Sequence, residues 1–305
     1  MTAPVPTGDN DVIAVQQAAL AALYRRHVGP GDHYALLDFP DHANVGDSAI
    51  WLGEIAELRA ITGRDPDHVC TWDGYDAAAL RRDSPAGIVF LHGGGNLGDI
   101  WPHHQRFREA VVGEMRDRRI VQLPQSIHFR APDGHRRFAD IVAAHGDVHL
   151  YVRDRPSLEF ARARFACPVA LAPDSAFALG PQLRGASECD VLMLMRTDAE
   201  RVSHDPADLP AGALTLDWLE DGPLPVRGQG EALHDHYAAL AAARVARGLA
   251  LLSRGRHIVT DRLHAHILAL LLDIPHVALD NDYGKLSAYI AAWTADAPQL
   301  GRAAS

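Results

Sequence analysis

The chain has 305 residues, 48% of them hydrophobic, and a formal net charge of −10. This composition supplies enough apolar surface for a packed core and excludes a disordered chain. Nucleic-acid binders carry a basic field, so this acidic chain is expected to have no nucleic-acid partner. Its apolar runs are far shorter than the ~20 residues needed to cross a bilayer. Residues 1–10 lack the cationic and apolar regions of a signal peptide.

The cysteines and the basic residues are unevenly used. Cys70, Cys167 and Cys189 lie far apart with no CxxC spacing. They predict neither a disulfide framework nor a zinc site, and they fit the reducing cytoplasm, where we expect the protein to be located. Lys285 is the only lysine among 29 Lys and Arg residues. Two causes would explain this imbalance. One is codon bias, and the other is a need for arginine, whose planar guanidinium binds phosphates and carboxylates.

Short apolar runs alternate with amphipathic segments along the first half of the chain. After a first helix within residues 11–27, we predict strands and helices in turn. The strands are expected at 34–37, 68–72, 87–91, 120–123 and 148–152, and the helices at 48–61, 105–116, 138–144 and 157–165. This alternation predicts a parallel sheet with helices on both faces.

A second α/β unit is predicted to begin near residues 180–188. Its strands are expected at 190–195, 257–260 and 275–279, and its helices at 234–252, 263–272 and 286–293. Residues 197–230 are rich in Pro, Gly and Asp, which predicts loops with one strand at 213–216. We therefore predict an α/β protein with domains 1–180 and 181–305 on either side of a cleft, and a last helix that packs back on the first domain.

A glycine-rich segment follows the predicted strand at 87–91. Its glycines let backbone N–H groups approach an anion, and their spacing also matches a dinucleotide-binding loop. That loop requires an acidic residue at the end of the next strand, where this chain has Gln125 and Ser126. A loop that binds a polar ligand is thus favoured over a dinucleotide site or a purely structural turn. Its candidate binding residues are His92, Gly93, Gly94, Gly95 and Asn96.

The segment 38–47 also joins a predicted strand to a helix, so it should open on the same edge of the sheet. Asn44 and Asp47 are suited to hydrogen-bond the hydroxyl groups of a substrate. Alternatively, Asp47 serves only as the N-cap of the following helix. The sequence favours these two roles equally.

Arg262 and His264 stand where a predicted strand gives way to the helix at 263–272. The free N–H groups and the dipole of a helix start favour an anion, a guanidinium adds positive charge, and an imidazole can transfer a proton. His264 and His266 are two residues apart and point to different helix faces, which disfavours a metal pair. The alternative role of Arg262 is a salt bridge to Asp261 or another acid.

Three more candidates follow strand ends, where the ligands of open α/β sheets bind. Arg196 follows the strand at 190–195 and is placed to converge with Arg262 on one anion. Arg153 follows the strand at 148–152, with a solvated charge cluster as the alternative. Ser126, beyond the strand at 120–123, is a candidate to position a hydroxyl.

Several common catalytic motifs are missing from the sequence. Ser126 lacks the G-x-S-x-G elbow of an α/β-hydrolase, and the chain has no phosphate-binding P-loop. No His-x-x-x-His pair with a neighbouring Glu is present, so no metal site is expected. The adjacent His103 and His104 are expected to be solvent-exposed.

Taken in order, these motifs resemble those of the polysaccharide pyruvyl transferase family. They are Asn44-x-Gly46-Asp47, His92-Gly93-Gly94-Gly95-Asn96-x-Gly98-Asp99, Pro124-Gln125-Ser126, Arg153-Asp154, Arg196-x-Asp198 and Thr260-Asp261-Arg262-Leu263-His264. The resemblance extends from about residue 34 to residue 283 and implies two Rossmann-like domains facing a cleft, as in GT-B glycosyltransferases. It further implies transfer of the enolpyruvyl group of phosphoenolpyruvate to two hydroxyls of one sugar in a polysaccharide or glycolipid precursor, which forms a cyclic pyruvate ketal and releases phosphate.

The resemblance also implies roles for the candidate residues. It places Arg196, Arg262 and His264 at the phosphoenolpyruvate site, and the glycine-rich segment and the Asn44 turn at the cleft. The donor carries a phosphate and a carboxylate, so it needs at least two fixed cations. His264 is the expected general acid for the CH2 group, and Asp47 or Asp99 the expected acceptor of the hydroxyl proton. Apart from this donor substrate, no cofactor is expected.

Two other classes of function remain open. A nucleotide-sugar glycosyltransferase would use the same fold, and a carbohydrate-binding protein without activity would keep only the cleft. The sequence does not specify the acceptor sugar. Because the family's acceptors are often lipid-linked, the expectation includes peripheral contact with the inner membrane face, and it leaves a homo-oligomer open.

Overall fold

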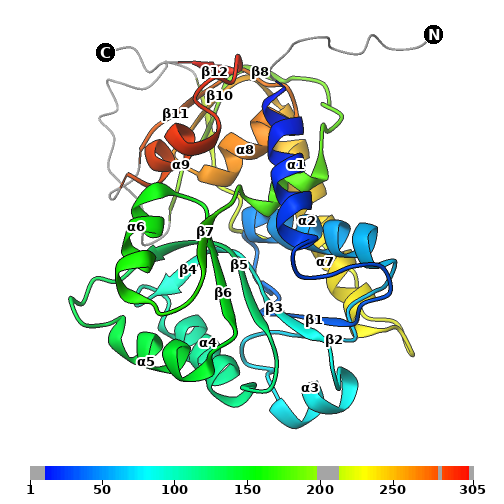
Figure 1. Ribbon diagram of the computed structural model, residues 1–305. Coiled ribbons are helices and arrows are strands. Elements are labelled where there is room, and N and C mark those ends of the chain that lie inside the picture. Colours follow the sequence, from blue (N-terminus) through cyan, green and yellow to red (C-terminus); the bar gives the residue numbers. More distant parts are fainter. Residues whose placement is uncertain (1–10, 198–212, 281–283, 302–305) are drawn as a thin grey trace.

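The computed structural model describes residues 11–197, 213–280 and 284–301. The strands of this part of the chain form two parallel sheets (Figure 1). The first sheet contains β1 (Tyr34–Leu37), β2 (His68–Cys70), β3 (Ile88–Leu91), β4 (Gly94–Gly98), β5 (Ile120–His128), β6 (Val148–Val152) and β7 (Val169–Leu171). Its order is β2-β1-β3-β5-β6-β7, and β4 pairs with β5. The predicted α/β class is therefore confirmed.

The second sheet is formed by the C-terminal part of the chain. Its strands are β8 (Cys189–Leu194), β9 (Leu214–Leu216), β10 (Gly255–Thr260), β11 (His276–Ala278) and β12 (Leu300–Gly301). They lie in the order β12-β11-β10-β8-β9. The helices are α1 (Val12–Tyr24), α2 (Val45–Thr62), α3 (Ala77–Asp83), α4 (Pro102–Glu114), α5 (Arg136–His145), α6 (Arg155–Arg164), α7 (Leu233–Ser253), α8 (Leu263–Leu271) and α9 (Lys285–Trp293), with a 3-10 helix η1 (Ser175–Leu179).

The first sheet is buried on both faces because the side chains of its strands alternate between two apolar clusters. In β1, Tyr34 and Leu36 join the cluster that contains α1 and α2, whereas Ala35 and Leu37 join the cluster that contains α4 and α5. Figure 1 shows these helix pairs on opposite sides of the sheet. Helices on both faces are what the near-continuous apolar strands predict.

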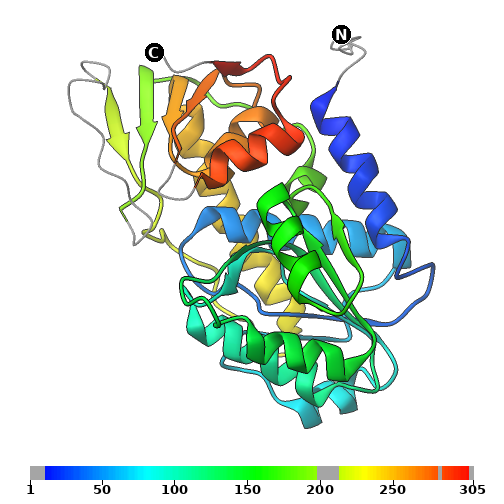
Figure 2. The same ribbon diagram turned by 60° about the vertical axis from the view of Figure 1, so that its left-hand side comes forward.

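Elements of the C-terminal part pack directly on the first sheet's helices. Helix α7 crosses α2 so closely that a Cβ on Gly248 would overlap the side chain of Val45 (Figure 2). The buried residues Trp51, Leu192 and Ile258 belong to one apolar cluster, which therefore extends from α2 to the strands of the second sheet. The boundary between the sheets lies between β7 and β8, and the division into domains 1–180 and 181–305 stays a prediction.

One predicted loop is partly a strand. Residues of the glycine-rich segment form β4, which pairs with an extension of β5 through Gly94 with Gln125 and Gly98 with His128. Gln125 and Ser126 consequently lie inside β5 and not beyond its end. The register of β5 against β6 shifts between Gln122 and Gln125, around Pro124, which has no N–H to donate to a ladder. The predicted end of this strand at residue 123 is therefore wrong, because the strand continues to His128 and its extension pairs with β4.

Candidate active site

A cavity of about 450 Å³ opens where the two halves of the chain meet. Its lining comes from β4, from the segments that follow β1, β2, β6, β8, β9 and β10, and from the N-terminal ends of α2, α4, α8 and α9. The candidate residues that line it are Asn44, Asp47, Gly95, Asn96, Arg153, Arg196, Arg262 and His264. The carboxyl ends of parallel strands meet at one sheet edge, which explains how residues more than a hundred positions apart gather there.

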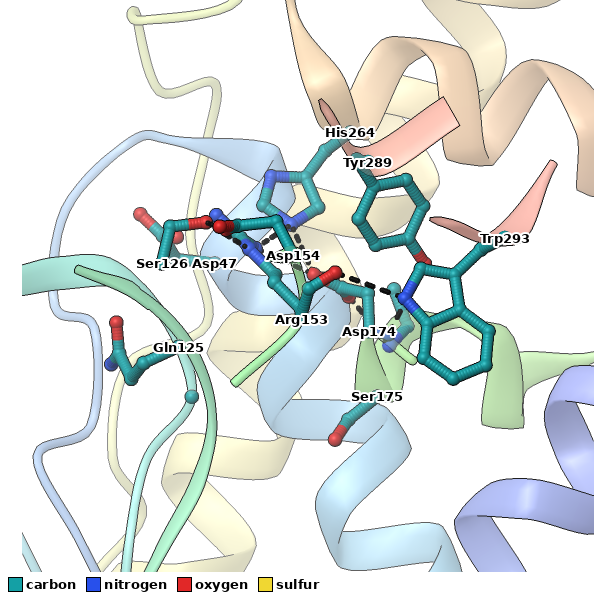
Figure 3. Close-up of polar contacts among 12 residues, drawn as sticks. Asp47, Gln125, Ser126, Arg153, Asp154, Asp174, Ser175, His264, Tyr289 and Trp293 are labelled. Atoms are coloured by element: carbon teal, nitrogen blue, oxygen red, sulfur yellow. Dashed lines mark hydrogen bonds and ion pairs between the residues drawn. The ribbon is translucent and has the colours of Figure 1, made fainter. Parts of the chain in front are cut away.

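His264 lies at the centre of a buried hydrogen-bonded cluster (Figure 3). Its Nε2 is 3.2 Å from Oδ2 of Asp174 and 3.5 Å from Nη1 of Arg153. The same Asp174 oxygen accepts a hydrogen bond of 2.6 Å from Nη1 of Arg153. Arg153 is therefore part of a buried cluster and not of a solvated group of charges, the alternative left open by the sequence.

Asp174 is a site residue that sequence reasoning missed. It is 1% exposed and caps η1 by accepting a hydrogen bond from the backbone N–H of Ala176. Burial opposes ionisation of this carboxyl, but His264 and Arg153 outweigh burial and hold its pKa well below the usual range. Asp174 follows β7, so it obeys the strand-end rule that identified Arg153; the brevity of β7 concealed it.

The other side of the His264 ring rests on the start of α2. Nδ1 lies against Gly46, where a Cβ would overlap the ring. No described residue hydrogen-bonds to Nδ1, whereas Nε2 is held by Asp174. A glycine at position 46 thus allows the histidine of α8 to seat on the first turn of α2.

Asp47 lines the cavity next to this contact. Its Oδ2 accepts a hydrogen bond of 2.8 Å from Asn44 and lies 3.6 Å from Nε2 of His42. The N-cap of α2 is Asn44, whose Oδ1 accepts from the N–H of Gly46, so the alternative that Asp47 only caps the helix is wrong. Burial opposes ionisation of Asp47, but His42 and His264 lower its pKa. The other candidate base, Asp99, binds the backbone N–H groups of residues 130 and 131 and does not line the cavity.

The guanidinium of Arg262 is held by Asp217 and Trp218, which follow β9. Its Nη2 lies 2.7 Å from both carboxylate oxygens of Asp217, and its guanidinium is 5.8 Å from the ring of Trp218. The alternative of a salt bridge to Asp261 or another acid is therefore realised with Asp217, whereas Asp261 accepts a hydrogen bond from the backbone N–H of Arg196. Both arginines line the same cavity as His264.

Four candidate residues do not line this cavity. His92 is buried, with Nδ1 2.7 Å from Glu54, and the N–H of Gly93 donates to the same carboxylate at 2.8 Å. Burial disfavours the imidazolium, but the charge of Glu54 outweighs it and raises the pKa of His92. Gly94 lies close to Asp47 without reaching the cavity. Ser126 lines an adjoining cavity of about 110 Å³ and bridges Arg153 to Asp154.

Four aromatic side chains, here called the aromatic wall, also line the cavity. Trp72, Trp101, His103 and His104 form it, and the rings of Trp72 and His103 are 4.8 Å apart. His104 is only 7% exposed, so the expectation of a solvent-exposed residue is wrong. Its Nδ1 is held 2.9 Å from Asp38, a residue with a left-handed backbone (φ 74°) that is rare for a non-glycine residue.

Two further properties concern the described residues alone. None of their His, Cys, Asp and Glu side chains form a group of three that could hold a metal ion. Among the helices of this part of the chain, none has the length and apolarity to cross a membrane.

Comparisons with known proteins identify the family of the chain. The family model for polysaccharide pyruvyl transferases matches residues 44–283, most of the chain. The chain is 33% identical to Pyruvyl transferase 1 of Schizosaccharomyces pombe over 304 residues. This match spans 92% of this chain and 74% of the relative. It is 30% identical to the putative pyruvyl transferase EpsO of Bacillus subtilis, over 86% of this chain and 85% of the relative.

The chain therefore belongs to the polysaccharide pyruvyl transferase family, as its motifs predict, and is a transferase. A functionally uncharacterized protein of Klebsiella pneumoniae, KP1_0663, has the same fold, with a TM-score of 0.63 over 95% of this chain and 99% of that protein. At 18% sequence identity, this likeness concerns the fold alone.

Proposed function

We propose that the protein transfers the enolpyruvyl group of phosphoenolpyruvate to two hydroxyls of one sugar in a glycan acceptor, forming a pyruvate ketal and releasing phosphate. The observation that carries this proposal is the gathering of Arg153, Arg196, Arg262 and His264 around one cavity. A donor with a phosphate and a carboxylate needs several fixed cations, and guanidiniums bind both groups through paired hydrogen bonds.

His264 is proposed to act as the general acid. When a sugar hydroxyl attacks C2 of the donor, the CH2 carbon takes up a proton and becomes a methyl group. Asp174 fixes Nε2 of the ring, so Nδ1, on the side of Gly46 and Asp47, is the atom that we assign to this proton transfer. A positioned acid of this kind contributes roughly 10²- to 10⁴-fold to a rate.

Asp47 is proposed to accept the proton of the attacking hydroxyl. Its lowered pKa keeps it ionised, and Asn44 orients it. The second hydroxyl then attacks the same carbon and closes the ketal as the C–O bond to phosphate breaks, and its proton leaves with the phosphate. Arg196 and Arg262 neutralise the phosphate as it leaves, a stabilisation worth several kcal/mol.

The aromatic wall is proposed to bind the acceptor, either free or lipid-linked. Trp72 is 42% exposed despite its large apolar surface, and it lines the cavity together with Trp101. Such a surface suits the apolar face of a sugar ring, while Asn96 and Asp41 on the same lining suit its hydroxyls.

Thermal unfolding with ligands tests the donor. Phosphoenolpyruvate is expected to raise the unfolding midpoint, because a ligand that binds only the folded state stabilises it, and Arg262→Ala should remove this shift. The control is Arg256→Ala, since Arg256 is 68% exposed and does not line the cavity. A shift with a nucleoside-diphosphate sugar but none with phosphoenolpyruvate would instead indicate a glycosyltransferase.

A further inference from the structure

Two arginines of helix α7 bind segments that line the active-site cavity. Arg244 and Arg247 are three residues apart, so their side chains lie on one face of the helix. Arg244 is 3% exposed, and the side chain of Arg247 is 19% exposed. Neither residue belongs to the lining of the cavity. Charged side chains are seldom buried to this extent unless they are paired, so their partners show what these two arginines hold in place.

The two guanidiniums share one carboxylate, that of Asp221. Nε and Nη2 of Arg244 donate to its Oδ2 at 3.2 and 3.1 Å, and Nη1 of Arg247 donates to its Oδ1 at 2.6 Å. Burial opposes ionisation of this carboxyl, but the two arginines outweigh burial and lower its pKa. Asp221 lies in the segment after β9 that also supplies Trp218 and Leu219 to the cavity lining. The shared carboxylate therefore ties this segment to α7.

Arg244 also binds the loop of residues 38–44, which joins β1 to α2 in the first unit. Its Nη1 donates to the carbonyl of Pro40 at 3.2 Å, and its Nη2 donates to Oδ1 of Asp41 at 3.1 Å. The close packing of Gly248 in α7 on the start of α2 brings the guanidinium within reach of this loop. Arg244 thus connects a loop of the first unit to a segment of the second.

Arg247 makes the same connection through a single nitrogen. Its Nη2 donates to the carbonyl of Ala43 at 2.6 Å and to the carbonyl of Trp218 at 2.9 Å. These carbonyls belong to the loop 38–44 and to the segment after β9, so one guanidinium fixes the spacing between them. An arginine is suited to this task because its donors are arranged in a rigid plane.

The loop 38–44 carries residues that the proposed function assigns to the acceptor. Asp41, His42 and Asn44 line the cavity, and Asn44 donates to the carboxylate of Asp47, the proposed acceptor of the hydroxyl proton. A displaced loop would therefore move the groups that hold and activate the sugar.

The donor side of the cavity has supports of its own. Asp217, the partner of Arg262, accepts hydrogen bonds from the backbone N–H and the hydroxyl of Thr197 at 3.0 and 2.6 Å. Asp261 accepts from the backbone N–H of Arg196. These contacts do not involve α7, so the two donor-side arginines keep their places when the guanidiniums of α7 are removed.

We propose that Arg244 and Arg247 are positioning residues for the acceptor: they hold the loop 38–44 against the segment 218–221 and so set the places of Asp41 and of the Asn44–Asp47 pair. This inference rests on the proposed function, because it takes these residues to face the sugar. Loss of either guanidinium should impair use of the acceptor and spare binding of phosphoenolpyruvate.

The variant Arg247→Met tests this separation, because it keeps the length of the side chain and leaves Arg244 on Asp221. The acceptor is the hexoside that the parent enzyme pyruvylates in a panel linked to p-nitrophenol or to a polyprenyl diphosphate. For this acceptor kcat/KM should fall by about 10- to 100-fold, as expected when catalytic groups are misplaced by about 1 Å. KM for phosphoenolpyruvate and the shift of the unfolding midpoint that it causes should stay nearly unchanged.

Two further variants complete the experiment. Arg247→Lys should recover only part of the loss, since one ammonium cannot reproduce the planar set of donors that meets three acceptors. Arg254→Met is the matched control, because Arg254 caps the same helix and its ion pair is with Glu188, which is 60% exposed. This control should behave like the parent enzyme with both substrates.

Unchanged kcat/KM for the acceptor in Arg247→Met would overturn the inference and leave the proposed function standing. Equal losses for donor and acceptor would show a general structural role and would also overturn it. If the parent enzyme pyruvylates no acceptor, the proposed function fails and the inference fails with it. Hydrogen–deuterium exchange needs no acceptor: the peptide that covers residues 39–45 should exchange faster in Arg247→Met, and an unchanged rate would contradict the proposal.

Discussion

The carboxylate of Asp174 lies 3.2 Å from Nε2 of His264, so a residue that follows the last strand of the first sheet fixes a ring carried by a helix of the second unit. Arg153 completes this contact from the neighbouring strand β6. The proposed acid is thus held in place only when both halves of the chain are packed together. Stability and activity are therefore linked through one carboxylate.

Replacing Asp174 should damage both properties. Asp174→Asn leaves the guanidinium of Arg153 buried and without its charged partner, which costs about 3–5 kcal/mol of unfolding free energy. Chemical denaturation measures this loss, and turnover should fall because His264 loses its orientation. Asp133→Asn is the control, because that residue is 64% exposed and its ion pair with Arg136 is at the surface. A full-length variant as stable as the parent would contradict the assignment.

The contact between Gly46 and His264 gives a test that removes no chemical group. Gly46→Ala should displace the imidazole, and a shift of about 1 Å in a catalytic group can cost ~10²-fold in rate. Gly113→Ala in α4 is the matched control, since the nearest atom to its Cβ would be 4.0 Å away. The readout is kcat with saturating donor. A Gly46→Ala enzyme of normal kcat would show that the ring need not rest on α2.

Replacing Glu54, which binds His92 and Gly93, tests whether these two residues of the glycine-rich segment are structural or bind the donor. Glu54→Gln should lower the unfolding free energy by about 1–3 kcal/mol, because His92 and the N–H of Gly93 lose a charged acceptor. KM for phosphoenolpyruvate should stay nearly unchanged, since neither residue lines the cavity. A large rise in KM at unchanged stability would instead show that His92 contacts the donor.

Acid should destabilise the protein partly through His27. Burial, followed by the charges of His149 and Arg119, lowers its pKa to about 4. Between pH 6.5 and 4 the unfolded chain therefore binds a proton that the folded chain does not, and the unfolding free energy falls by about 1–3 kcal/mol as the pH is lowered. His27→Gln should flatten this part of the stability profile. The control is His257→Gln, because His257 is exposed, and this variant should leave the pH dependence of the unfolding free energy unchanged. An equal pH dependence in the two variants would refute the prediction.

The sequence predicted the strands and helices of the two units well wherever apolar runs were long. It did not predict β4, because glycines carry no side-chain pattern, nor β7, whose three residues are only half-buried. The strand-end rule correctly brought Arg153, Arg196 and Arg262 to one cavity. It cannot tell which partner each one meets, so it missed Asp174, which binds Arg153 within the first unit, and Asp217, which binds Arg262 within the second.

His92 is a candidate residue whose partner the sequence did not reveal. A histidine beside glycines at a strand end suggests a ligand contact. In the structure, however, its ring is hydrogen-bonded to Glu54, a buried residue in the middle of α2. Glu54 gave no signal in the sequence, since a single acid within an amphipathic helix is ordinarily solvated. Only the packing of α2 on the sheet brings the two together.

The most direct measurement is phosphate release from phosphoenolpyruvate with a panel of glycan acceptors, followed by mass analysis of each acceptor. The account predicts that phosphate appears only with an acceptor that offers two suitably placed hydroxyls. That acceptor should gain one pyruvate for each phosphate released, and Arg262→Ala should abolish both signals. Phosphate release that leaves every acceptor unmodified, or sugar transfer from a nucleoside-diphosphate sugar, would contradict it.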